Sequence, residues 1–179
     1  YDTAYADFNL LAVAAIAQEL KRTVTRELEL FGRDLKSGSL QRKHLAAFAL
    51  AFSTEKVAQG WLQESLKDPA PSVVEISLVA LGMLQFEDTP IELFKAHLSS
   101  PSWHVRQAAL FGLRYQLKEG KNGGAMTEVV KLLEDPQMDV RNEALIVLRR
   151  MKAKEAIDSI LNQTYKNFEF VIIGDHCTD

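Results

Sequence analysis

The chain has 179 residues, of which 47% are hydrophobic and 25% are charged, and its formal net charge at pH 7 is −3. This length and composition are typical of a folded domain with one sizeable core. The negative charge disfavours nucleic acids and anionic membranes as partners, because both select clustered Lys and Arg. The single cysteine, Cys177, excludes an internal disulfide.

The most apolar stretch is residues 8–17, and it is too short to span a bilayer. It also has no basic leader, so it does not resemble a signal peptide. We therefore expect a membrane to be reached only through a segment that this sequence does not contain. The compartment stays open: the cytoplasm is favoured, and a periplasmic or membrane-tethered location is the alternative.

The first element in the chain is helical. Residues 7–35 contain no proline, and their only glycine is Gly32. This predicts one long helix or two short ones over residues 5–35, ended by Ser-Gly-Ser at 37–39. We expect residues 1–38 to cap the structure that follows.

Three later segments repeat one pattern, in which a Leu begins a short polar turn with Pro at its fourth position and a Val follows. The segments are residues 66–73, 98–105 and 133–140, and their leading leucines are 32 and 35 residues apart. A self-similarity at this period is typical of a solenoid of stacked helix pairs. Such a solenoid presents an extended surface, which commonly binds another macromolecule.

The helix after each turn carries apolar residues spaced by five and then three positions. The four sets are Val73, Leu78 and Leu81; Val105, Leu110 and Leu113; Val140, Leu145 and Leu148; and Leu40, Leu45 and Phe48 in a copy with a shortened turn. This spacing predicts four second helices that each bury the same stripe.

The first helix of each pair is expected over residues 54–66, 89–98 and 127–133, and a further first helix from Lys154. Thr89, Pro90 and Glu92 predict a capping box at one of these starts. The glycine-rich residues 119–124 are interpreted as a length insertion. They do not predict a phosphate cradle, because no strand precedes them.

The motif from Asp135 to Leu148, with Val140, Arg141 and Ala144 between, resembles the core motif of HEAT and HEAT-like repeats. Residues 101–113 match it nearly as well, and residues 69–81 match more loosely. The resemblance covers residues 39–165 and implies an all-α, right-handed α-solenoid of about four helix pairs. The N-terminal helix and a non-repeat tail at 166–179 complete one structural domain.

The resemblance also implies a ladder of turn acids and second-helix arginines between neighbouring repeats. Asp68 is expected to reach Arg106, whereas Ser100 offers Arg141 no charge, so the ladder is interrupted. We expect these arginines to have structural roles.

Two subfamilies with this architecture contain enzymes. The di-iron hydroxylases bind metal through His-Glu pairs, and none of the four histidines here precedes a Glu. We therefore expect no metal, no cofactor and no catalytic residues. Bilin lyases also contain such repeats, and a lyase-like protein is kept as an alternative.

Residues 156–179 resemble a short stretch of family 2 glycosyltransferases, in which a helix leads to a strand and an acidic turn. Asp175 and Asp179 keep the acids, but Gly174 replaces one acid, and His176 and Cys177 replace Gly-Ser. The nucleotide-binding strand that should precede the helix is missing, and parallel strands need both partners. A fragment or accessory of such an enzyme is therefore a second alternative.

On the second helices, one sector of the helical wheel lies opposite the packed stripe. It contains Trp103, Gln107, Phe111 and Arg114, then Glu75, Val79 and Gly82 on the preceding helix, and Asn142, Ile146 and Arg149 on the following one. Trp, Phe and Arg are typical anchors of protein interfaces. The sequence thus predicts a non-catalytic scaffold that binds a protein or peptide there.

Two alternatives to this surface remain. Phe111, Val79 and Ile146 could simply pack against adjacent helices, which would leave no binding strip. The repeats could also be a structural spacer within a longer chain.

Overall fold

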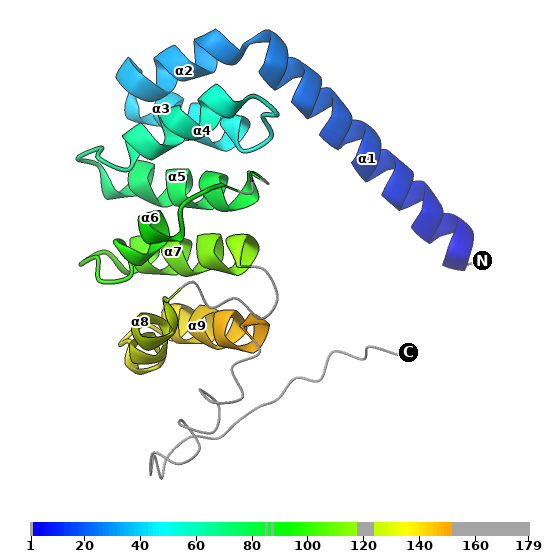
Figure 1. The fold of residues 1–179 in the computed structure, drawn as a ribbon. Coiled ribbons are helices and arrows are strands. Elements are labelled where there is room, and N and C mark those ends of the chain that lie inside the picture. Colours follow the sequence, from blue (N-terminus) through cyan, green and yellow to red (C-terminus); the bar gives the residue numbers. More distant parts are fainter. Residues whose placement is uncertain (1, 85, 87, 118–123, 152–179) are drawn as a thin grey trace.

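The structure is a computed structural model that describes residues 2–84, 86, 88–117 and 124–151, with side chains from Ala14 onward. Within these ranges it consists of helices and contains no strand (Figure 1). The prediction of an all-α fold is confirmed. The helix expected at Lys154 and the tail at 166–179 lie outside the described residues.

The helices pack in consecutive pairs. The pairs are α2 (Leu28–Ser37) with α3 (Leu40–Leu50), α4 (Lys56–Ser65) with α5 (Pro71–Met83), α6 (Ile91–Lys95) with α7 (Trp103–Gln116), and α8 (Met126–Lys131) plus the 3₁₀-helix η1 (Leu132–Glu134) with α9 (Met138–Arg150). The second helices α3, α5, α7 and α9 also pack against one another in that order, one below the next (Figure 1). The described chain is therefore an α-solenoid, as predicted.

The helix α1 (Asp2–Arg26) runs away from this stack and makes its main contacts with the first pair, α2 and α3 (Figure 1). Val24 is buried near its C-terminal end, whereas Ile16 and Leu20 are exposed. The chain breaks at Glu27 into a long helix and a short one, so neither N-terminal alternative, one long helix or two short ones, is fully correct. None of the described helices is both long and apolar enough to span a membrane.

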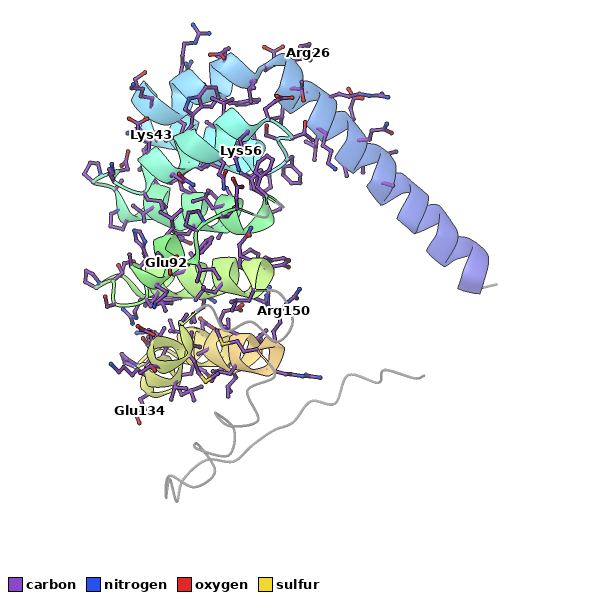
Figure 2. All side chains as sticks on the ribbon, viewed as in Figure 1. Arg26, Lys43, Lys56, Glu92, Glu134 and Arg150 are labelled. Carbon is purple, nitrogen blue, oxygen red and sulfur yellow. The ribbon has the colours of Figure 1, made fainter. Side chains whose placement is uncertain are left out.

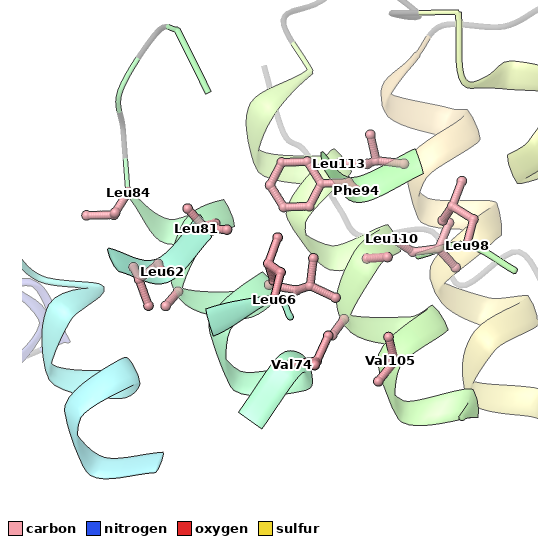
Figure 3. Close-up of a cluster of buried hydrophobic side chains, with 14 of the residues drawn as sticks. Leu62, Leu66, Val74, Leu81, Leu84, Phe94, Leu98, Val105, Leu110 and Leu113 are labelled. Carbon is pink, nitrogen blue, oxygen red and sulfur yellow. The ribbon is translucent and has the colours of Figure 1, made fainter. Parts of the chain in front are cut away.

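The predicted stripe is correct for the two middle second helices. Leu78 and Leu81 on α5, and Leu110 and Leu113 on α7, are fully buried. Figure 3 shows the same cluster with the ring of Phe94 from α6 beside Leu113. The core therefore lies between the two helices of each pair and continues along the stack.

The predicted stripe is wrong for α3. Leu40, Leu45 and Phe48 are all exposed, and the buried residues of this helix are Ala46, Ala47 and Leu50. The Ser-Gly-Ser turn is shorter than the others, so aligning the copies at Leu40 shifts the register. When α3 is aligned by its buried residues, Ala47 and Leu50 correspond to Leu78 and Leu81 of α5, 31 residues later.

Leu145 of α9 is also an exception, because it is 42% exposed although the matching Leu78 and Leu110 are fully buried. Ala144, Val147 and Leu148 are buried instead. The helices α5 and α7 each pack against a following second helix, and no described helix follows α9.

The turns share one hydrogen-bond pattern. The side chains of Asp68 and Asp135 accept from the backbone N–H two residues later, at 2.9 Å in both cases, and Ser100 accepts from Ser102 at 3.3 Å. These local bonds fix the chain reversal at a proline, which follows the bonding residue directly and cannot continue the preceding helix.

The same acids join neighbouring repeats. Arg106 donates to both carboxylate oxygens of Asp135, at 2.6 and 2.8 Å, and to the carbonyl of Ser100 in its own turn at 2.8 Å. Lys43, labelled in Figure 2, donates to one carboxylate oxygen of Asp68 at 2.5 Å. The expected Asp68–Arg106 pair is therefore wrong, because each base reaches the turn of the following repeat. The middle rung is absent because Val74 stands at the equivalent position.

The predicted capping box at Thr89 is also wrong. The helix α6 begins at Ile91 and has no side-chain cap. Thr89 is buried, where its hydroxyl accepts a hydrogen bond from Gln59 at 2.8 Å and donates one to the carbonyl of Phe86 at 3.1 Å. The polar group that would have capped α6 instead ties the loop to α4.

Two glycines let α5, α6 and α7 approach closely. A Cβ atom on Gly82 would lie 2.7 Å from the Cα of Gly112, and a Cβ on Gly112 would overlap the ring of Phe94. Gly82, which the helical wheel placed in the exposed sector, is in fact buried here.

Replacing Gly112 with Ala should lower the free energy of unfolding by about 1–3 kcal/mol, because the Phe94 ring has no room to move in the packed core. Chemical denaturation measures this. Gly60→Ala is the control, because Gly60 is helical and has no atom within 4 Å of the added Cβ, so it should stabilise by about 0.5–1 kcal/mol. Equal effects at both sites would contradict the packing argument.

Burial raises the pKa of Asp135, but the hydrogen bonds from Arg106 and from the Gln137 N–H lower it more, so the pKa lies below its ordinary value. The stability that this carboxylate provides is full above its ordinary pKa and is lost as pH falls through the lowered, folded-state pKa. Asp135→Asn should cost about 3 kcal/mol at pH 7, because Arg106 loses its partner.

The same variant should flatten the loss of stability below about pH 4. Denaturation curves across pH measure both effects. Glu19→Gln removes only an exposed pair with Arg22 and should change stability by less than about 1 kcal/mol. An unchanged acid profile in Asp135→Asn would refute this role.

Candidate functional site

An apolar strip crosses the four second helices. Phe48, Val79, Phe111 and Ile146 occupy equivalent positions on α3, α5, α7 and α9, at intervals of 31, 32 and 35 residues. Phe48 and Ile146 are 48% and 43% exposed, and the other two are partly buried. We call these four residues the second-helix strip. Phe48 was not predicted, because the misaligned first copy had assigned it to the core.

A second apolar row lies one helical turn further along, at Phe52, Met83 and Tyr115. The rings of Phe48 and Phe52 meet edge to face at 5.4 Å, and those of Phe111 and Tyr115 are tilted at 4.7 Å. Two side chains of the strip, Phe48 and Phe111, are thus each supported by an aromatic ring four residues later, which helps to keep them in place.

A shallow hollow of about 190 Å³ opens at the centre of this surface, between α5, α7 and α9. We call it the central hollow. It is lined by Glu75, Val79, His104, Gln107, Ala108, Phe111 and Glu143. Four of these residues, namely Glu75, Val79, Gln107 and Phe111, were among the predicted partner-binding residues, and the fold brings them together.

The sequence analysis missed three lining residues, His104, Ala108 and Glu143, and Glu143 is the one that carries an acid. Its side chain is 12% exposed, and Arg114 lies 3.2 Å from its Oε1 atom. Oε1 is nevertheless buried without a hydrogen-bond donor. Burial raises the pKa of Glu143, and the positive charge of Arg114 offsets only part of this increase. The sequence did hold a signal for Glu143, because the equivalent positions of the other copies carry the apolar residues Leu45, Ile76 and Ala108.

Arg114 borders the hollow and holds its aromatic side in place. Its guanidinium lies 4.9 Å from the centre of the Phe111 ring and 5.0 Å from that of Tyr115, while it pairs with Glu143 across the α7–α9 contact. Through these cation–π contacts and the ion pair, the guanidinium of Arg114 is already engaged within the protein.

The other predicted residues do not line the hollow. Trp103 packs partly against the core, and its ring stacks on His104 with the centroids 3.6 Å apart. Asn142, Ile146 and Arg149 lie on α9, where Ile146 and Arg149 are exposed and Asn142 is also accessible. Their part in binding stays a prediction.

No group of three or more His, Cys, Asp or Glu side chains that could bind a metal is present in the described part of the chain. The ligand-type residues Asp175, His176, Cys177 and Asp179 lie outside that part, as does the whole transferase-like segment.

The turns and the helix pairs are those that the resemblance implied, whereas the ladder between repeats has other partners than expected. The model of HEAT repeats matches residues 91–169, and no enzyme family was found. Residues 91–169 are therefore similar in sequence to HEAT repeats. No curated protein matches the chain.

Among solved structures, the chain is similar to a designed armadillo repeat protein in complex with the peptide (KR)4. The TM-score is 0.57 at 16% sequence identity, and the alignment covers 93% of this chain and 88% of that one. At this identity the likeness shows the fold, a stack of helical repeats.

The buried carboxylate of Glu143 should make the folded chain less stable. With a raised pKa, the folded state binds more protons than the unfolded state between the ordinary pKa and the raised one, so stability falls as pH rises through that window. Glu143→Gln should therefore stabilise the chain at pH 7, by about 1 kcal/mol.

Paired denaturation curves at pH 7 and about pH 4 test this, and the gain should shrink at the lower pH. Glu92→Gln, an exposed acid on α6, provides the control for loss of one negative charge. Destabilisation by Glu143→Gln at pH 7 would show that its pairing with Arg114 outweighs its burial.

Proposed function

We propose that this chain is a non-catalytic scaffold that binds a peptide or a protein segment on the surface of its second helices. The observation that carries the proposal is the second-helix strip, a row of apolar side chains that crosses four helices and stays partly exposed. A folded protein gains stability by burying such residues, so an uncovered row favours a surface that a partner covers.

The types of residue on this surface support a protein partner. Phe48, Phe111 and Tyr115 are large side chains with few rotatable bonds, and Arg114 joins two of them. Aromatic and arginine side chains contribute most to binding where they are held in place beforehand. The designed armadillo repeat protein with a similar fold is itself in complex with a peptide.

A scaffold also agrees better with the sequence than the enzyme alternatives do. The family comparison gives HEAT repeats and no enzyme family. The central hollow is shallow, and it offers two acids and a histidine without a nucleophile beside a base. A pure spacer would have no need of exposed aromatic side chains at equivalent positions.

The test begins with a phage-displayed library of random peptides selected on the whole chain. Peptides that bind are then measured by fluorescence anisotropy against the wild type and against a Phe48→Ala/Phe111→Ala variant. We expect a loss of affinity of about tenfold or more, because both anchors are removed from the surface.

Val57→Ala is the matched control, because Val57 is 46% exposed on α4, in the layer of first helices. It should leave the affinity unchanged. Circular dichroism verifies that each variant keeps its helices. If no peptide is selected, or if the selected peptides bind the double variant as well as the wild type, the proposal is wrong.

A further inference from the structure

The central hollow combines acidic and apolar groups in a way that the packing of the fold does not require. Glu75 from α5 and Glu143 from α9 contribute carboxylates on its two sides, and Val79, Ala108 and Phe111 form an apolar wall. None of the described residues that line it is a lysine or arginine. Arg114 beside it supplies one positive charge against these two negative ones.

The carboxylate of Glu143 is incompletely satisfied. Its Oε1 atom is buried and has no hydrogen-bond donor, although the Nη1 atom of Arg114 lies 3.2 Å away. A buried acceptor without a donor lowers stability, and a charged one does so more strongly. The pKa of Glu143 stays raised because Arg114 offsets only part of the effect of burial. A second positive charge in the hollow would therefore lower this cost without touching the buried Oε1 atom.

The residues that line the hollow limit which cation can enter it. A lysine or arginine side chain has an apolar stem and a cationic tip, which matches an apolar wall that ends at carboxylates. Phe111 adds an aromatic face, and a cation near such a face is attracted to it. A hydroxyl or amide group carries no positive charge, so it would not offset the two carboxylates.

We infer that the central hollow takes a lysine or arginine side chain of a bound peptide, while apolar neighbours in that peptide lie on the second-helix strip. This inference rests on the proposed function. Glu75 and Glu143 would then select basic partners, and the strip would supply most of the contact area.

The probe is a fluorescein-labelled octapeptide of alternating lysine and leucine, compared by fluorescence anisotropy at constant salt with an octapeptide of alternating glutamine and leucine. We expect the wild type to prefer the basic peptide. In a Glu75→Gln/Glu143→Gln variant its affinity for the basic peptide should fall about tenfold or more, because the cation loses both partners.

A Glu64→Gln/Glu92→Gln variant is the matched control. Both acids are exposed on the first helices α4 and α6 (Glu92 is labelled in Figure 2), so the net charge changes equally at a distance from the hollow. It should lose less than about threefold, since exposed charges are screened. An equal loss in both variants would show that overall charge attracts the peptide, and would overturn the inference.

The inference and the proposed function can fail separately. If peptides from the random library bind in a way that needs Phe48 and Phe111, but the basic octapeptide shows no preference, the scaffold stands and the cation site is wrong. If neither kind of peptide binds, both are wrong. Glu143→Gln is expected to fold stably, so an unfolded double variant would point to Glu75, and the single Glu143→Gln variant then tests the site alone.

Discussion

The bond between a turn acid and the base of the preceding repeat joins the first helix pair to the second and the third to the fourth, and the stack depends on it there. Asp135 accepts the Gln137 N–H in its own turn and both donors of Arg106 from the repeat before it. One carboxylate therefore fixes the chain reversal and the offset between two helix pairs. Asp68 does the same with Lys43. Because each helix pair alone leaves an apolar face uncovered, such rungs and the packing between them act together.

This offset decides which residues share a surface. Once α3, α5, α7 and α9 are stacked in register, Phe48, Val79, Phe111 and Ile146 fall on one line although about 30 residues separate each from the next. The close approach at Gly82 and Gly112 brings α5 and α7 near enough for their side chains to border one hollow. Contacts that stabilise the stack thus also form the candidate site.

The site carries the features that packing alone does not explain. Glu143 occupies a row in which the other three copies are apolar, and its burial raises its pKa. Residues that reduce stability at a surface hollow are often retained for binding. Two arginines differ in the same respect. Arg106 donates hydrogen bonds to two turns and so serves the packing, whereas Arg114 stabilises aromatic side chains beside the hollow.

The sequence alone determined the fold class, the turn positions and the buried stripes of α5 and α7, because period and turn chemistry are local properties of the chain. It also indicated Glu75, Val79, Gln107 and Phe111. Only the tertiary structure decided the register of α3, the partner of Arg106 and the burial of Glu143. Each of these depends on how one repeat is placed on the next, since a shift of two residues turns Phe48 from the core to the surface. That placement is set by contacts between residues far apart in the chain, which no local pattern records.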